Sequence, residues 1–239
     1  MINIRRALKK FAPTFRQARE ASLNEADTVL RLCKFFEDVL GYDPIEDVSR
    51  EANLRNKFVD VCLKIKGNVK ILVEAKAASV QLRDRHIEQA QSYASQNNYR
   101  WVLLTNGVEW NLYHLTFSEG IEYDLAFGVS LATDDGVEQA AEKLAFLHKE
   151  AVRKGELDTL WETATALSAS SIGKSLFTLP VLKFLRRQIR KDVGILVDEE
   201  DLANALHEML TVDAREQIGP LRIRKPRKAA SRTTPNPAI

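Results

Sequence analysis

Two short apolar runs at residues 58–65 and 69–76 constrain the fold of this chain more than any other stretch. Both runs contain several β-branched residues, and Lys66-Gly67-Asn68 separates them. A short connection with Gly and Asn between two such runs is typical of a β-hairpin with antiparallel strands. The rest of the chain is therefore expected to be organised around this hairpin.

Three charged residues interrupt the apolar pattern of the hairpin. Asp60 lies on the first expected strand, and Glu74 and Lys76 lie at the end of the second. Glu74 and Lys76 are two residues apart, so on a strand they project from the same face. Two carboxylates and an ammonium at one sheet edge can hold a hard divalent cation and direct a water molecule onto a phosphodiester.

A purely structural interpretation of the same residues is a salt bridge across the hairpin. A pair between Lys76 and either Asp60 or Glu74 would stabilise the strands by roughly a few tenths of a kcal/mol. The neighbouring residues are apolar, however, and buried carboxylates without a cationic partner are costly. The metal site is the favoured interpretation.

An amphipathic helix is expected from Ser22 to about Leu40, after a first helix over residues 4–20 that is broken at Pro13. Glu25 lies on the inward face of the second helix, where it could join the carboxylates of the hairpin. The alternative is that Ser22 to Glu25 form a capping box, which would by itself explain a Glu at this position.

A third helix is expected over residues 80–96, after the hairpin. Gln89 and Tyr93 are four residues apart on it and share a face. They are either neighbours of the site or, respectively, a surface amide and a core aromatic residue. Residues 100–105 and 108–115 then form a second hairpin around an Asn106-Gly107 type I′ turn. The order of elements predicts an α/β or α+β core.

The charged residues stand in a pattern that resembles the PD-(D/E)xK nucleases. The closest similarity is to the N-terminal nuclease domain of the restriction subunit of type I restriction-modification enzymes. This family shows an acidic residue on an early helix, an Asp, a strand ending Glu-Ala-Lys, a helix with Q-x-x-x-Y and a strand followed by Thr-Asn-Gly. Here the motifs stand as Glu25, Asp60, Glu74-Ala75-Lys76, Gln89 to Tyr93 and Thr105-Asn106-Gly107. The resemblance covers about residues 20–116, and Val59 replaces the Pro that often precedes the Asp.

The resemblance implies a restriction-endonuclease-like mixed sheet flanked by helices, and a Mg²⁺ site in which Mn²⁺ can substitute. The implied metal ligands are Glu25, Asp60, Glu74 and the carbonyl of Ala75. Lys76 would position or deprotonate the attacking water, and Gln89 and Tyr93 would orient Lys76 or contact the DNA backbone.

Three segments are expected along the chain. Residues 1–132 form the nuclease domain, residues 133–215 a helical module that offers an interaction or dimerisation surface, and residues 216–239 a basic flexible tail. Six Lys or Arg and no acid lie in residues 221–239, which leaves 29 basic and 33 acidic residues elsewhere. Any affinity of the body for phosphate must therefore be local.

Several other classes of protein are disfavoured. No apolar run is long enough for a membrane span, and the N-terminus lacks the apolar stretch of a signal peptide. Two free cysteines, Cys33 and Cys62, are typical of a cytoplasmic protein. The four histidines are scattered, and no ATP site is found, since Gly173-Lys174-Ser175 lacks the first Gly of a phosphate loop and a preceding strand.

The sequence thus predicts a Mg²⁺-dependent DNA endonuclease in the cytoplasm. Its partners would be DNA and either other restriction-modification subunits or a second copy of the chain. The alternative is a catalytically silent nuclease-like module that binds DNA or a partner protein.

Overall fold

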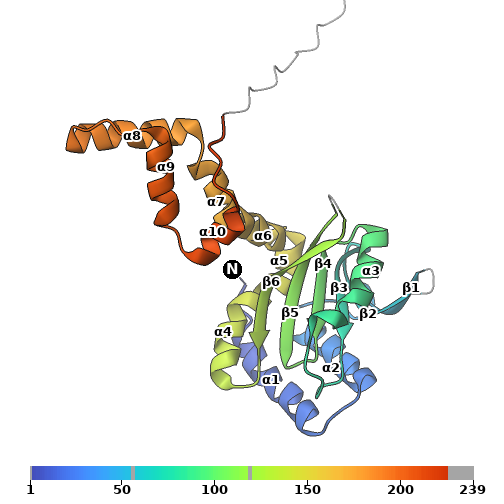
Figure 1. Ribbon diagram of the computed structural model, residues 1–239. Helices are drawn as coiled ribbons and strands as arrows, with labels where there is room; N and C mark the ends of the chain where they lie inside the picture. Colours follow the sequence, from blue (N-terminus) through green and yellow to red (C-terminus); the bar gives the residue numbers. More distant parts are fainter. Residues whose placement is uncertain (1, 55–56, 118–119, 226–239) are drawn as a thin grey trace, which may run out of the picture. The chain divides into compact units, whose positions relative to one another are not determined.

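The computed structural model describes residues 2–54, 57–117 and 120–225 (Figure 1). Within these ranges the side chains of residues 51–54, 57–58, Asp84, Gln89 and Tyr93 are not described. The chain divides into two compact units, Met1–Trp161 and Glu162–Ile239.

The first unit contains a six-stranded mixed sheet whose strand order follows the chain, β1-β2-β3-β4-β5-β6. The strands are β1 (Val48–Leu54), β2 (Lys57–Ile65), β3 (Asn68–Ala75), β4 (Trp101–Thr105), β5 (Glu109–Thr116) and β6 (Glu122–Ser130). All neighbours are antiparallel except β3 and β4, which are parallel and are joined through α3 (Glu88–Asn97). The expected α/β fold with a restriction-endonuclease-like mixed sheet is confirmed.

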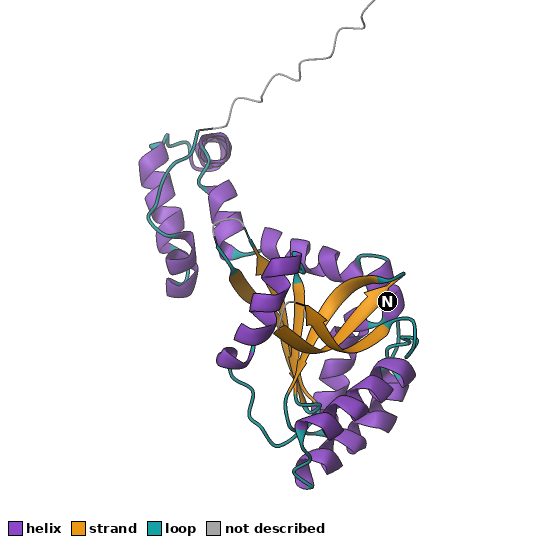
Figure 2. Cartoon of the chain, turned by 90° about the vertical axis from the view of Figure 1, so that its right-hand side faces the viewer, coloured by secondary structure: helices purple, strands orange, loops and turns teal. Residues whose placement is uncertain are grey.

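Helices cover both faces of this sheet (Figure 2). The helices α1 (Arg5–Glu20), α2 (Glu25–Asp38) and α4 (Asp134–Leu144) contribute to the larger apolar core on one face, which includes Phe15, Phe35 and Trp110. On the opposite face α3 packs against β2, β3 and β4 over a smaller core. Because both faces of the sheet are covered, the central strands β3 and β4 are buried over most of their length and are mostly apolar in sequence.

The boundary between the units lies later than the sequence indicated. We expected the nuclease domain to end at residue 132, but α4 packs on α1 and β6 and belongs to the first unit. Val137, Ala140 and Leu144 are buried in its main core. An amphipathic helix can cover a sheet as well as another helix, so its sequence alone did not show to which unit α4 belongs.

Some local expectations were wrong for identifiable reasons. Pro13 lies inside a continuous α1, whose buried stripe of Leu8, Ala12, Phe15 and Ala18 runs past it. The N-cap of α2 is Asn24, whose Oδ1 accepts a hydrogen bond from the Asp27 amide at 2.9 Å, and not Ser22.

Two further differences concern β6 and the turn before β5. The strand β6 was not expected, because exposed residues interrupt its apolar pattern. The turn between β4 and β5 is not type I′, because Gly107 has a positive φ of 85° and Asn106 does not.

The second unit is helical. Its elements are α6 (Glu156–Ala166, which begins in the first unit), α7 (Ala169–Leu176), α8 (Leu179–Val193), α9 (Glu199–Glu208) and α10 (Val212–Ile218). Phe177, Leu182, Leu202 and Ala203 form its buried core. The remaining helical segments, the 3₁₀ turns Asp84–His86 and Ala145–Leu147 and α5 (Lys149–Arg153), lie in the first unit.

The first part of the expected flexible tail is ordered. Residues 216–218 belong to α10, and Leu221 and Ile223 pack on the core of the second unit. The backbone of Arg224 bonds to the Phe177 carbonyl and the Leu179 amide, at 2.9 Å each. These apolar and backbone contacts override a composition that is mostly polar and basic. The expectation for residues 226–239 lies outside the described residues.

None of the described helices is both long and apolar enough to cross a membrane.

Candidate active site

The hairpin of β2 and β3 brings Asp60 and Glu74 to neighbouring positions. Its register pairs Val61 with Val73, so Asp60 and Glu74 stand at the next pair along the strands. The Oδ2 atom of Asp60 accepts a hydrogen bond from the Ala75 amide at 2.7 Å, which fixes its carboxylate beside the end of β3. The two carboxylates predicted for the site are therefore adjacent.

The Glu74 carboxylate is buried, and only one of its oxygens is satisfied. Glu74 is 2% exposed, and its Oε1 accepts a hydrogen bond from Nζ of Lys76 at 2.5 Å. Its Oε2 is buried without a hydrogen-bond partner in the described part of the chain. Burial, the largest cause, acts together with the charges of Asp60 and Glu25 against the opposing effect of Lys76, and the net result is that the pKa of Glu74 is raised to about 7.

Lys76 is the cation of the site and contacts two carboxylates. Besides Glu74, its Nζ lies 3.6 Å from Oε2 of Glu25, the first residue of α2. Burial tends to lower the pKa of Lys76, but the hydrogen bond to Glu74 and the charges of Glu74, Glu25 and Asp60 outweigh it, so the pKa is raised. Lys76 is therefore an ammonium at neutral pH.

The segment after β4 holds Lys76 in place. The Lys76 amide donates to the Thr105 carbonyl at 2.9 Å, which continues the parallel pairing of β3 and β4. Asn106 is 2% exposed, and its Nδ2 donates to the carbonyl of Val80 at 2.8 Å. Its Oδ1 accepts from the amides of Val108 and Glu109 at 3.0 and 2.7 Å. Asn106 thus closes its own turn and ties down the segment that follows Lys76.

Sequence reasoning had placed Asn106 in a turn and in the Thr105-Asn106-Gly107 motif, and had given it no contact with Val80. Its residue type gave no sign of the bond to Val80, because a side-chain amide bonded to a distant carbonyl leaves no periodic pattern. The only available signal was its place in the Thr105-Asn106-Gly107 motif.

The start of α2 lies beside this edge of the sheet. The Ala78 amide donates to the Leu23 carbonyl at 3.1 Å, and this link brings Glu25 within reach of Lys76. Glu25 is about half exposed and contacts the ammonium. Its predicted role as a metal ligand is not tested by this arrangement.

The site suits a divalent cation in one respect and is incomplete in another. The unpartnered, buried Oε2 of Glu74 beside the Asp60 carboxylate is the kind of donor that a hard cation binds. However, no group of three or more His, Cys, Asp or Glu side chains within the described residues has the arrangement of a metal site. The side-chain donors that fit are therefore the pair Asp60 and Glu74.

The predicted helix residues are only partly visible. Gln89 and Tyr93 lie on α3, which packs over β2 and β3, but their side chains lie outside the described residues. His86 precedes α3, and its Nδ1 accepts from the Arg83 amide at 3.1 Å. Burial lowers the pKa of His86, as do the charges of Arg85, Lys76 and Arg83.

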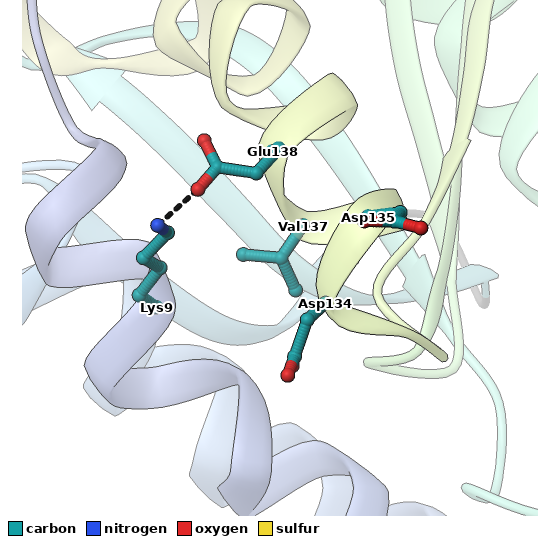
Figure 3. A pocket seen from close by; sticks show the side chains of 5 residues that line it. All are labelled: Lys9, Asp134, Asp135, Val137 and Glu138. Carbon is teal, nitrogen blue, oxygen red and sulfur yellow. Dashed lines mark ion pairs between the residues drawn. The ribbon is translucent and has the colours of Figure 1, made fainter.

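A separate hollow of about 370 Å³ lies where α1 meets α4, lined by Lys9, Asp134, Asp135, Val137 and Glu138 (Figure 3). Two of its carboxylates are already paired, since Lys9 bonds to Glu138 and Arg16 to Asp134. None of the predicted site residues lines this hollow.

The family comparison agrees with the geometry. Residues 33–123 match the family model described as Type I restriction enzyme R protein N terminus (HSDR_N). The match includes Asp60, Glu74 and Lys76, whereas Glu25 lies before it. Neither the curated proteins nor the solved structures gave a significant match. The match covers 91 of the 239 residues and supports a nuclease-like domain of this kind in the first unit.

Proposed function

We propose that the first unit is a Mg²⁺-dependent DNA endonuclease. The observation that carries this proposal is the buried Glu74 carboxylate, which has Lys76 on one oxygen, no partner on the other and Asp60 alongside. Placing the partly buried Asp60 beside the buried Glu74 is costly, and a purely structural hairpin gains little from it. The family match over the same residues supports this interpretation.

Asp60 and Glu74 would hold the metal, with the Ala75 carbonyl and Glu25 as further ligands by resemblance. Bound Mg²⁺, or Mn²⁺ in its place, would supply charge neutralisation at the phosphate and a more acidic water. Lys76, with its raised pKa, acts as a fixed positive charge and hydrogen-bond donor and not as a proton acceptor. In this role it stabilises the charge that develops on the phosphate oxygens. Gln89 and Tyr93 remain the candidates for orienting Lys76 or contacting the DNA backbone.

The direct test is to incubate supercoiled plasmid with the full chain and Mg²⁺ or Mn²⁺. We expect nicking by the wild type and none by Lys76→Ala or Asp60→Asn. Lys70→Ala is the matched control, because Lys70 is an exposed lysine on the same strand. Nicking that persists in Lys76→Ala would show that a contaminant or another site is responsible.

A second function is favoured by one feature of the site. Lys76 contacts both Glu74 and Glu25, so two carboxylates are already partly neutralised by the chain itself. A catalytically silent module that binds DNA or a partner protein would need no more than this. DNA binding by wild type without nicking in either metal would support this alternative.

The partners follow from the proposal. DNA is the substrate, and other restriction-modification subunits or a second copy of this chain are proposed partners by resemblance to the family. Such a role also places the protein in the cytoplasm, where its DNA substrate would be found.

A further inference from the structure

Helix α8 of the second unit, which is labelled in Figure 1, carries a row of cations. We refer to these residues as the α8 stripe: Lys183, Arg187, Arg190 and Lys191. Relative to Lys183 they lie four, seven and eight residues along the chain, so at about 100° per residue they fall within an arc of about 100° on one side of the helix. All four are exposed, and the only acid of α8 is Asp192 in its last turn.

The α8 stripe differs from the charged surfaces of α2 and α5, on each of which a cation is paired with acids of the same helix. On α2, Lys34 pairs with Glu37 and Asp38, and on α5, Arg153 pairs with Glu150. In the described part of the chain, none of the four stripe cations forms an ion pair. Arg186, on the adjacent side of α8, does pair with Glu199 of α9. Like charges three or four residues apart destabilise a helix. The repulsion within the stripe therefore lowers the stability of α8, and a bound anion would relieve it.

The opposite side of α8 is already occupied. Leu182 is fully buried, and Leu185 and Ile189 pack with it on the core of the second unit. A helix that binds a membrane surface inserts a continuous apolar face into the lipid. The exposed apolar residues of α8, Phe184 and Val193, are nine residues apart and lie on opposite sides of the helix, so they form no such face. The continuous exposed side of α8 is the charged one, and it suits a hydrophilic polyanion.

We propose that the α8 stripe binds the phosphate backbone of DNA, outside the domain that the family match covers. Lys183 and Lys191 are separated by about 12 Å of helix, a length over which duplex DNA presents about seven phosphate charges. Arg222 and Arg224 add exposed cations next to the start of α8, because the Arg224 backbone bonds to Phe177 and Leu179. The choice of DNA rests on the proposed function of the first unit.

The stripe can be tested by neutralising it and comparing the result with a matched charge change elsewhere. The stripe variant is K183Q/R187Q/R190Q/K191Q. The control, R6Q/K10Q/K143Q/K174Q, removes four exposed cations for which the structure shows no ion pair. Binding of a fluorescent duplex to the full chain is measured by anisotropy in chelator over a series of salt concentrations. Circular dichroism verifies that both variants keep their helix content.

We expect the slope of log K against log salt to fall by about 3.6 in the stripe variant if all four residues contact phosphates. The control variant should keep most of the wild-type slope. Equal losses in the two variants would reduce the effect to net charge and overturn the proposal, as would an unchanged slope in the stripe variant. Stripe-dependent binding to vesicles of phosphatidylcholine and phosphatidylserine, without DNA binding, would assign the stripe to membranes.

The same measurement separates this inference from the proposed function. Lys76→Ala should lose nicking, and its salt slope should fall by no more than about 0.9, the share of one phosphate contact. A stripe-dependent slope with no nicking by wild type would reject the nuclease and keep the stripe. Nicking that depends on Lys76, together with the same salt slope in the stripe variant as in wild type, would keep the nuclease and reject DNA binding by the stripe.

Discussion

Lys76 and Glu74 form an ion pair of 2.5 Å at the end of β3, in which the side chain of the acid is 3% exposed and that of the base 18%. Each partner compensates for much of the cost of burying the other. The Lys76 backbone is in turn fixed by Thr105, so the position of the pair depends on the neighbouring strand.

Removing the cation should destabilise the fold. We expect Lys76→Ala to lower the free energy of unfolding by about 3 kcal/mol, because a buried carboxylate would lose its cation. Urea denaturation measures this, and Lys70→Ala should change it by less than about 0.5 kcal/mol. The double variant Lys76→Met/Glu74→Gln should lower the free energy of unfolding by less than the sum of the losses in the two single variants. Strict additivity would mean that the two side chains do not interact energetically.

The raised pKa of Glu74 predicts a pH-dependent stability. Between its ordinary value of 4.5 and about 7, the unfolded chain loses the Glu74 proton while the folded protein keeps it. Stability from this group is therefore complete below pH 4.5 and is lost as the pH rises toward 7, by about 3 kcal/mol.

This dependence is measured by urea denaturation in chelator at several pH values from 5 to 8. Glu74→Gln should flatten the curve in this window, and the exposed Glu142→Gln, with the same charge change, should not. A wild-type curve without a fall between pH 5 and 7 would contradict the burial of an acid at this position.

Divalent ions should stabilise the wild type. Bound metal would relieve the repulsion between Asp60 and Glu74, and a concentration one hundred times the dissociation constant adds about 2.7 kcal/mol. The melting temperature should therefore rise in Mg²⁺ or Mn²⁺, less at pH 6 than at pH 8, because a proton on Glu74 competes with the metal. Asp60→Ala should lose both this rise and the calorimetric heat of binding. Equal heats for wild type and variant would argue strongly against the site.

Asn106 offers a test of how the site is held. Asn106→Ala removes three hydrogen bonds of a buried side chain, and we expect a loss of about 2 kcal/mol or more. Asn106→Asp keeps the acceptor for Val108 and Glu109 but removes the donor to Val80. If the tie to Val80 positions Lys76, this variant should lose nicking while retaining most of its helix and strand content. Full nicking by Asn106→Asp would show that the tie is dispensable.

The sequence predicted the centre of the fold well and its periphery poorly. The hairpin that carries Asp60 and Glu74 was predictable because alternating turn and strand signals are local properties of the chain. β6 and the place of α4 were not, since both depend on which surface is left for them to cover. Val137 and Leu144 are apolar residues of an ordinary amphipathic helix, and only the assembled sheet shows where they pack.

The candidate site divides in the same way. Spacing placed Glu74 and Lys76 on one face, and the ion pair agrees with that prediction. The N-cap of α2 was assigned to Ser22 because the serine and glutamate matched a capping box. The capping oxygen belongs to Asn24, and Ser22 takes a left-handed conformation with φ of 50° before the helix. Two capping candidates this close in sequence cannot be separated without the path of the preceding chain.

The strand order of the sheet implies an order of folding for the site. β2 and β3 are joined by a tight turn, so little entropy is lost when Asp60 and Glu74 come together. Lys76 is fixed only when β4 docks, because its amide bonds to Thr105 across a connection that includes α3. The acidic pair should therefore form first and its ammonium should be placed last. Pulse-labelled hydrogen exchange during refolding should show the β2 and β3 amides protected before that of Lys76, and simultaneous protection would exclude this order.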